Sequence, residues 1–260
     1  MRDCMEQLFQ HFRKEEQPFI EQVEDWLRQV DDYYTPYVTD FLNPRERYIV
    51  ETLTNRSSFS VQEDGGFDGA ERARMIIYPA YVEPTREDFQ LTVREIQYAS
   101  KFVTIEHPDV LGAMMSLGLD RSKFGDIVVQ DDRIQIAYAN EIDSYVQANF
   151  VEVGSATIRL KEPNERLCAQ VTLHEEVVIV SSLRLDVIVT ALARLGRQKA
   201  QQLIERERVK LNFQTVTDQA EPVQLGDLLS IRTLGRFHIL EIEGRTKKEK
   251  WIIRVGKVIS

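Results

Sequence analysis

The 260-residue sequence predicts an α+β protein made of three successive regions: an N-terminal helical segment, a middle β-α-β-β-α-β domain, and a C-terminal pair of helices on a small sheet. Three observations predict this fold class. Apolar residues recur at helical spacing near the N-terminus, strand and helix patterns alternate in the middle, and two short helical patterns precede β-alternation at the end. Since a chain of this length holds two or three compact units, we expect domains over residues 1–80, 81–165 and 181–260.

The N-terminal region contains two amphipathic helical patterns followed by a strand. Residues 18–34 and 43–55 carry apolar stripes, and Asn43 is placed as the N-cap of the second helix. A glycine-rich turn then leads into the apolar run 75–78, which Pro79 ends. This region is therefore expected to be mainly helical.

The middle region alternates strand and helix patterns in a regular order. The expected elements, strand, helix, strand, strand, helix and strand, cover residues 89–97, 107–119, 125–130, 133–139, 140–150 and 155–162. Residues 130–132 fit a hairpin turn between the two central strands. Two helices on one face of a four-stranded antiparallel sheet give the split-βαβ arrangement that ferredoxin-like and RRM-like domains share. The aromatic string with which a standard RRM stacks bases is absent, so sequence-specific base reading by this domain is not expected.

The C-terminal region follows a poorly patterned connector, residues 162–176, which we take as a domain boundary. Apolar residues fall on one helical face over 185–195, Gly196 is expected to end that helix, and a second short stripe covers 200–204. Strands are then expected over residues 209–216, 237–244 and 250–259, and residues 224–233 are expected to hold a Gly-Asp turn followed by a strand. The two helices should pack on this small sheet and leave the basic residues at its solvent edge.

The charge is unevenly distributed. Residues 181–260 hold 15 Lys and Arg against 9 Asp and Glu, a balance of +6, which leaves −15 for residues 1–180 in a chain of net charge −9. A basic module attracts nucleic acid and an acidic one repels it, so we expect the C-terminal region to be the one that binds RNA.

Compartment and metal content are also constrained by the sequence. It shows neither a signal-peptide pattern nor an apolar run long enough to span a membrane, so we expect a cytoplasmic protein without membrane insertion. The two cysteines and four histidines have no ligand-like spacing, and neither structural zinc nor a disulfide is expected.

The stretch RLDVIVTALARLGRQKAQQLIERERVKLN, followed by LGDLLSIRTLGRF, resembles an S4 RNA-binding domain. It departs from that pattern at Gly196, where a serine is usual, and at Phe213, where many S4 domains have glycine. With DGGFDGAERARMIIYP, HPDVLGAMMSLGLDRSKFGDIVV and GRTKKEKW, the likeness extends over nearly the whole chain to the YlmH family. This resemblance implies a helical N-terminal part, an RRM-like middle domain and a C-terminal S4 domain.

The resemblance also implies a function. Members of this family are bacterial cytosolic proteins similar to the small S4 factors that bind the large ribosomal subunit with peptidyl-tRNA after a stalled ribosome splits. We accordingly expect a non-catalytic, monomeric RNA-binding protein that docks on structured 23S rRNA or tRNA of the 50S subunit, in ribosome-associated quality control.

Two other function classes remain open. An RNA-modifying enzyme with an S4 appendage is the first, although Asp126, Asp131 and Asp132 have no nucleophile or base at recognisable spacing, so no catalysis and no cofactor are expected. The second is a scaffold linked to cell division, which the family's association with division genes suggests.

The candidate RNA-binding residues are Arg and Lys side chains that lie mostly off the apolar stripes. Arg offers a planar fork to phosphate oxygens and Lys a point charge. A solvated helix face is the alternative interpretation. The expected RNA contacts are Arg184, Arg197, Lys199, Arg206, Lys210, Arg232, Arg236, Lys247 and Lys248.

A weaker set of candidates lies in the first two regions. Arg72 and Arg74 accompany the glycine-rich GGFDGAERAR stretch, which either approaches phosphates or forms a tight turn shaped for packing. Arg121 and Lys123 are expected on an exposed corner. By contrast, Asp186 is expected to be structural, capping a helix or pairing with a nearby Arg.

Overall fold

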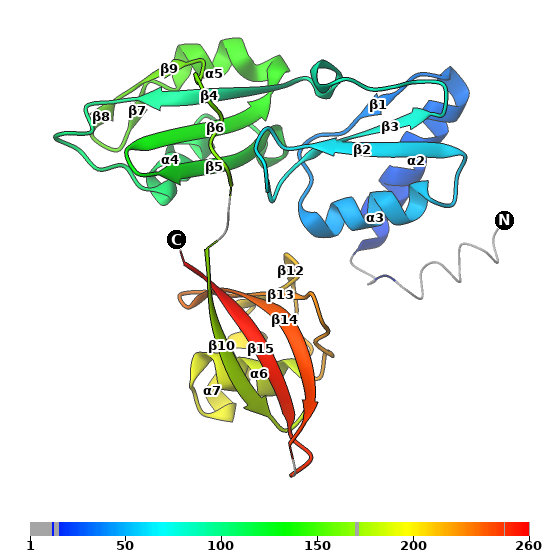
Figure 1. Cartoon of the computed structure of the whole chain (residues 1–260), viewed down its shortest axis with the longest axis vertical. Helices are drawn as coiled ribbons and strands as arrows, with labels where there is room; N and C mark the ends of the chain where they lie inside the picture. Colours follow the sequence, from blue (N-terminus) through cyan, green and yellow to red (C-terminus); the bar gives the residue numbers. More distant parts are fainter. Residues whose placement is uncertain (1–11, 13–15, 170–171, 247, 260) are drawn as a thin grey trace. The chain divides into compact units, whose positions relative to one another are not determined.

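The computed structural model describes residues 12, 16–169, 172–246 and 248–259 (Figure 1). It divides into two compact units, residues 1–170 and 171–260. Within the described residues, no helix is long and apolar enough to cross a membrane. The mixture of helices and antiparallel sheets confirms the α+β class.

The N-terminal part of the first unit is a three-stranded sheet, in the order β1-β3-β2, with two helices packed on it. Asn43 caps α3 as expected, since its side chain accepts hydrogen bonds from the Arg45 and Glu46 amides while the Glu46 carboxylate accepts one from the Asn43 amide. β1 and β2 were not expected. The elements are α2 (Gln17–Tyr33), β1 (Tyr37–Val38), α3 (Pro44–Thr54), β2 (Phe59–Asp64) and β3 (Arg74–Pro79).

The middle part of this unit has the expected split-βαβ arrangement. Its four antiparallel strands lie in the order β5-β6-β4-β9, and the predicted hairpin turn is present. Gln130 still pairs with Arg133, so the turn itself is residues 131–132. The main elements are β4 (Leu91–Gln97), α4 (His107–Met115), β5 (Phe124–Gln130), β6 (Arg133–Ala139), α5 (Asp143–Asn149) and β9 (Arg159–Lys161). Shorter pieces are the 3₁₀ turns η2 (Arg86–Phe89), η3 (Arg121–Lys123) and η4 (Asn140–Ile142) and the strands β7 (Glu152–Val153) and β8 (Ala156–Thr157).

Both faces of the middle sheet are covered. Ile134 and Ile136 pack under α4 and α5, as the split-βαβ pattern requires. The opposite face, which an RRM-like domain would offer to RNA, is filled by Phe41, Phe67 and Leu167. Among the described residues, these side chains occupy the face on which a base would stack, which agrees with the missing aromatic string.

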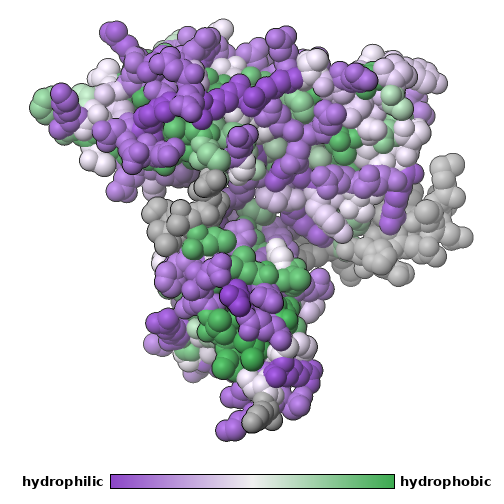
Figure 2. All heavy atoms as spheres, in the orientation of Figure 1, coloured by the Kyte–Doolittle hydropathy of each residue, from purple (hydrophilic) through white to green (hydrophobic). Residues whose placement is uncertain are grey.

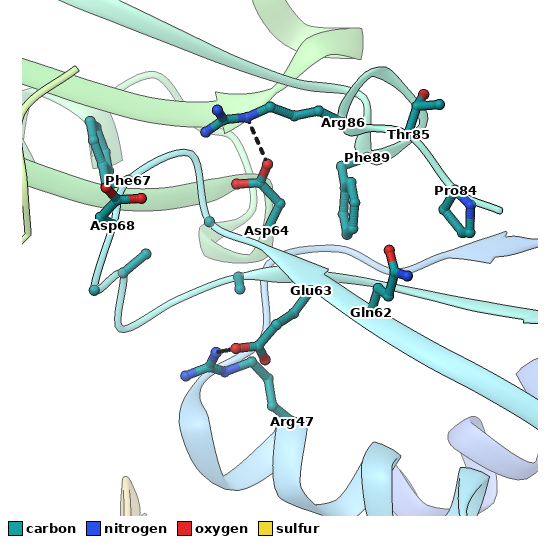
Figure 3. A pocket seen from close by; sticks show the side chains of 14 residues that line it. Arg47, Gln62, Glu63, Asp64, Phe67, Asp68, Pro84, Thr85, Arg86 and Phe89 are labelled. Carbon is teal, nitrogen blue, oxygen red and sulfur yellow. Dashed lines mark ion pairs between the residues drawn. The ribbon is translucent and has the colours of Figure 1, made fainter. Parts of the chain in front are cut away.

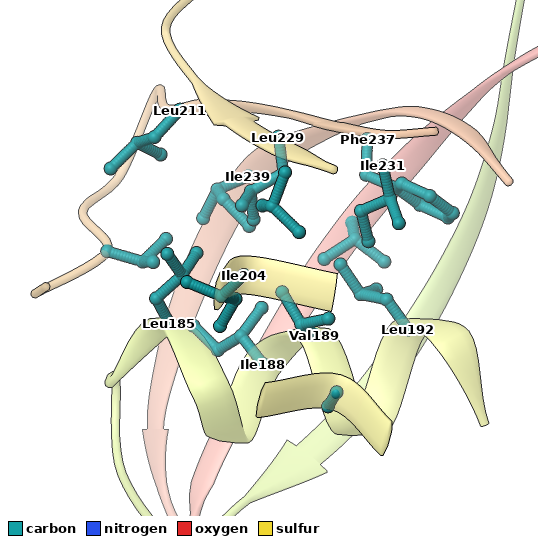
Figure 4. Close-up of a cluster of buried hydrophobic side chains, with 14 of the residues drawn as sticks. Leu185, Ile188, Val189, Leu192, Ile204, Leu211, Leu229, Ile231, Phe237 and Ile239 are labelled. Atoms are coloured by element: carbon teal, nitrogen blue, oxygen red, sulfur yellow. The ribbon is translucent and has the colours of Figure 1, made fainter. Parts of the chain in front are cut away.

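The C-terminal unit has two helices on a six-stranded antiparallel sheet in the order β10-β15-β14-β13-β11-β12. Its core is mostly aliphatic and lies between the helices and the sheet, where Ile188, Val189 and Ile204 meet Leu229 and Ile239 (Figure 4). The elements are β10 (Thr172–Val180), α6 (Leu185–Ala193), α7 (Arg197–Glu205), β11 (Val209–Leu211), β12 (Gln214–Thr215), β13 (Leu228–Ile231), β14 (Gly235–Arg245) and β15 (Trp251–Ile259).

Three local expectations for this unit were wrong. The last five residues of the expected connector, 172–176, belong to β10, which pairs with β15 from Thr172 to Val180. Residues 209–216 form a tight hairpin rather than one strand, because Asn212 and Phe213 both have positive φ, 48° and 69°. The helix α6 ends at Arg194 (φ 52°) rather than at Gly196, which is the N-cap residue of α7.

Candidate nucleic-acid interface

The first turn of α6 and the start of α7 meet at a buried carboxylate. Asp186 has no exposed side-chain surface, and Arg184 Nε lies 3.0 Å from its Oδ1. Arg197 NH2 lies 3.0 Å from the other oxygen, Oδ2. The expected structural role of Asp186, pairing with a nearby arginine, is thus confirmed. We call Arg184, Asp186 and Arg197 the Asp186 cluster.

The Asp186 cluster carries a net charge of +1 and orients two guanidinium groups. Burial by itself would raise the pKa of Asp186, but hydrogen bonds from Arg184 and Arg197 outweigh it, and the pKa lies below its usual range. Each arginine gives two of its five N–H groups to the carboxylate. Both remain accessible, with 43% and 64% of their side-chain surface exposed, so other donors can reach a phosphate.

The N-terminus of α7 also favours an anion. Its N-cap residue is Gly196, which has no side chain to cap the first amides, and its first turn carries no acidic residue. Instead, Arg197 occupies the first position and exposed Lys199 the third. Cations at a helix N-terminus are unfavourable, because the helix dipole is positive there. A phosphate bound at this end would accept hydrogen bonds from the amides and reduce the repulsion between the helix dipole and the two cations.

The other predicted residues of this unit do not all lie on the helix side. Lys210 lies between Val209 and Leu211, whose side chains are in the core, so it projects from the opposite face of the sheet. Lys210 pairs with Ser230, which pairs in turn with Arg236, so the two cations share that face. The single basic rim that the sequence suggested is therefore divided between two faces.

The remaining candidates lie at turns. Exposed Arg232 donates its amide to the Arg208 carbonyl, which brings it near Arg206 at the end of α7. Lys248 is exposed in the connection between β14 and β15. Lys247 lies outside the described residues.

Arg72 and Arg74, the secondary RNA candidates of the N-terminal region, make hydrogen bonds within the first unit. Arg72 NH2 donates to the Phe41 carbonyl at 2.5 Å. Arg74, only 3% exposed, donates to the Thr39 and Gln90 carbonyls at 2.7 Å each. Burial lowers the pKa of both arginines.

The corner that holds Arg121 and Lys123 is not a free basic surface either. Arg121 NH1 donates to the Phe124 carbonyl at 2.6 Å, and burial lowers the pKa of Arg121. Lys123 Nζ is paired with Asp40 at 2.8 Å and with Glu141 at 2.6 Å. The expected exposure of these two cations is therefore corrected: their charges are used within the unit.

The glycine-rich stretch is a packing turn. A Cβ on Gly65 would lie 2.5 Å from the Arg72 carbonyl oxygen, and one on Gly66 would lie 2.8 Å from Val93 Cγ2. Asp126 accepts the Glu71 amide at 2.6 Å, and burial raises the pKa of this carboxyl. The stretch is thus anchored to the middle sheet. The anchoring role of Asp126 had no sequence signal, because it depends on a contact 55 residues away along the chain.

A cavity of about 660 Å³ lies beside this stretch (Figure 3). Ion pairs line it: Arg47 NH1 lies 2.7 Å from a Glu63 oxygen, and Arg86 Nε lies 3.0 Å from an Asp64 oxygen. Asp68 adds a further carboxylate. With its cations paired, the cavity presents no surplus of positive charge to a phosphate.

Comparison with known proteins gives consistent matches along the chain. Residues 15–82 match the domain family described as "YlmH, N-terminal", residues 84–166 the one described as "Putative RNA-binding domain in YlmH", and residues 183–229 the S4 domain. The chain is 39% identical over 249 residues to "Ribosome-associated protein quality control protein P2" of Bacillus subtilis (strain 168), covering 95% of this chain and 97% of that protein. It is also similar to the solved structure of "Cell division protein ylmH from Streptococcus pneumoniae", with 31% identity and a TM-score of 0.53, covering 59% of this chain and 93% of that one.

Proposed function

The chain belongs to the YlmH family, and from this premise we propose that it is a non-catalytic RNA-binding protein that docks on structured 23S rRNA or tRNA of the large ribosomal subunit. Its proposed role is ribosome-associated quality control, the process named for the Bacillus subtilis relative. We further propose that it acts as a monomer in the cytoplasm.

One observation carries the proposal: the uncapped, cationic N-terminus of α7 beside the Asp186 cluster. The helix dipole, the absence of a capping side chain at Gly196 and the oriented guanidinium groups all favour a phosphate at the same place. We call Arg184, Arg197 and Lys199 the helix surface. Because such contacts position a nucleic acid without reading its sequence, the expected target is defined by its shape and phosphate arrangement.

The test compares two double variants of the full chain that each remove two charges. Arg197→Ala with Lys199→Ala, on the helix surface, is expected to make the slope of log K against log salt shallower by about 1.4–1.8, at about 0.7–0.9 per lost phosphate contact. The matched variant, Lys210→Ala with Arg236→Ala, lies on the opposite face of the sheet and is expected to leave the slope unchanged. Filter binding to 50S subunits and to a structured RNA over a salt series measures both slopes. If only the Lys210→Ala, Arg236→Ala variant showed a shallower salt slope, RNA binding would be assigned to the face of the sheet opposite the helices.

The enzyme alternative has a separate test. If deletion of the gene removes a modified nucleotide from rRNA or tRNA, and the purified protein restores that nucleotide in vitro, the non-catalytic proposal is wrong. We expect the modification profile to be unchanged, since Asp126, one of the candidate carboxylates, accepts the Glu71 and Arg72 amides.

A further inference from the structure

The face of the C-terminal sheet that turns away from the helices carries exposed apolar residues. Along β10, Val178 and Val180 contribute to the core, so their neighbours Val177 and Ile179 project from the other face. These two side chains are 55% and 57% exposed. Isoleucine and valine at such exposure on one strand are unusual for a surface that only meets water.

The apolar residues continue onto the neighbouring strand. Ile179 pairs with Ile252 and Val177 pairs with Arg254 in the β10–β15 register, so Val177, Ile179 and Ile252 are adjacent on the same face. Figure 2 shows hydrophobic side chains gathered over the strands of this unit. The three residues form the apolar part of what we call the sheet surface.

The charged part of the sheet surface is acidic. Arg254 is surrounded by three carboxylates, Glu243 at 2.6 Å, Glu241 at 3.4 Å and Glu175 at 3.7 Å. One cation among three anions leaves a net charge of −2, so phosphates are repelled here. Arg236 lies on the same face but far from the apolar residues. The strand register aligns it with Val258, which is six residues from Ile252 along β15, or about 20 Å at about 3.3 Å per residue.

The strand that carries this surface is also an open edge of the sheet. Among the described residues, β10 pairs with β15 alone, and this pairing runs without a bulge over nine residues, 172–180. It contains no proline and no lysine, two features with which edge strands commonly prevent further pairing. A regular edge of this length can take up another extended segment by main-chain hydrogen bonds.

We propose that the sheet surface binds an extended protein segment that adds to the edge of β10, with apolar side chains beside Val177 and Ile179 and a Lys or Arg beside Glu175. A second copy of this chain fits poorly, because antiparallel self-pairing would gather Glu175 and Glu176 of both copies along one short edge. RNA is disfavoured by the three carboxylates. Charge complementarity instead selects a basic segment, which is common in proteins that themselves bind RNA.

This inference rests on the proposed function in one respect: the partner is taken to be a protein of the large-subunit complex. The helix surface and the sheet surface lie on opposite faces of one small unit. RNA and the protein segment can therefore be bound at the same time.

The experiment places a photoreactive benzophenone side chain in the full chain, in place of Ile179 in one variant and Lys199 in another. Each is irradiated on purified large ribosomal subunits, and adducts are separated by nuclease and protease digestion. Position 179 is expected to give adducts with a basic, apolar peptide, and position 199 adducts with RNA. The inference would be overturned if position 179 gave adducts with RNA, or no adduct at all. It would also be overturned if position 179 gave adducts only with residues 1–170 of this chain or with a second copy of it. Loss of RNA adducts at 199 alone would overturn the proposed function and leave the inference standing.

A charge reversal tests the recognition itself. In the chain with benzophenone at position 179, Glu175→Lys is expected to reduce the peptide adduct at least about tenfold, the effect of losing about 1.4 kcal/mol of binding free energy. Asp132→Lys, the same charge change at an exposed turn of the first unit, is the matched control and should leave the adduct unchanged. Equal reduction by both variants would mean that only overall charge matters, and would refute a defined site on β10.

Discussion

Asp186 shows how one residue can serve both fold and function. It is buried, and its two oxygens bind the guanidinium groups of Arg184 and Arg197, which come from different helices. A buried carboxylate is stable only when it is paired and hydrogen-bonded in this way. The same bonds fix the orientation of two proposed RNA-binding side chains before any RNA arrives, which lowers the entropy lost on binding.

Asp186→Asn is expected to destabilise the C-terminal unit by about 1–3 kcal/mol at pH 7, because charge-assisted hydrogen bonds become neutral ones. The folded pKa of Asp186 lies below its unfolded value of about 3.9, so its contribution is present above that pH and is lost as the pH falls through the lower folded pKa. The difference in free energy of unfolding between Asp186→Asn and the parent protein should therefore shrink as the pH falls below about 3.9.

Urea unfolding read from Trp251, with Trp26→Phe in both proteins, measures this difference at pH 7 and about pH 3. Glu176→Gln is the control, because it removes only a surface pair with Arg194 and should cost no more than about 0.5–1 kcal/mol. A pH-independent effect of Asp186→Asn would show that packing rather than charge is responsible.

At the scale of single elements, the sequence predicted those whose apolar period was regular. α2, α3 and the six elements of the middle domain follow helical or strand spacing closely, and they were found at the expected places. β10 was missed because Val177 and Ile179, exposed on the outer face, turn an alternating strand into the continuous run VVIV. The end of α6 was missed because Arg194 adopts the left-handed conformation that glycine usually supplies.

The candidate site was only partly predictable for a related reason. A list of basic residues does not say which face of a strand each one occupies until the strand register is known. The meeting of Arg184 and Arg197 at Asp186 depends on how α6 and α7 pack together, which the sequence does not give. The face shared by Lys210 and Arg236 depends on the pairing of β11, β13 and β14. Burial of Arg74 depends on the Thr39 and Gln90 carbonyls, which no local pattern places beside it.

The glycine-rich turn gives a prediction at the same scale. Gly66 has φ +87°, and an added Cβ would overlap Val93, whereas Gly118 has φ +72° with open space around it. Both Gly→Ala substitutions place an L side chain in the left-handed region, which costs about 1–2 kcal/mol of folding free energy. Gly66→Ala should cost about 1–3 kcal/mol more than Gly118→Ala, because of the steric overlap.

Unfolding of the first unit read from Trp26, with Trp251→Phe in all proteins, measures both effects. Equal destabilisation by the two substitutions would show that the turn yields to the extra methyl group, and would weaken the case for a packing role.

For the whole molecule, the division of charge follows the division into units. The acidic first unit uses several of its arginines internally, while the C-terminal unit leaves exposed cations such as Lys199, Lys210 and Arg232. The boundary between the units lies after residue 170, which assigns β10 to the C-terminal unit. RNA binding is therefore expected to be a property of residues 171–260.

A truncation pair tests this assignment. Residues 171–260 are expected to fold and to retain much of the RNA affinity of the full chain. Residues 181–260 should be unfolded or aggregated, because they lack β10, lose Val178 and Val180 from the core, and expose the edge of β15. Circular dichroism measures the folding of both fragments, and a binding assay measures their RNA affinity. If residues 1–170 bound RNA as tightly as residues 171–260, the assignment would be reversed.

The filled second face of the middle sheet has a consequence for biosynthesis. Phe41 and Phe67 precede the strands that they cover, whereas Leu167, whose amide donates to the Gln135 side chain at 2.9 Å, follows all of them. During translation the sheet therefore keeps part of its apolar face uncovered until residue 167 has left the ribosomal exit tunnel. Its closing contacts join residues about a hundred positions apart, as in the 3.0 Å bond from Arg166 to the Gly66 carbonyl, and contacts of such long range form slowly. A nascent chain halted before residue 167 would thus hold this unit incomplete, so that a protein proposed to act on stalled ribosomes would itself be exposed to misfolding by an early stall.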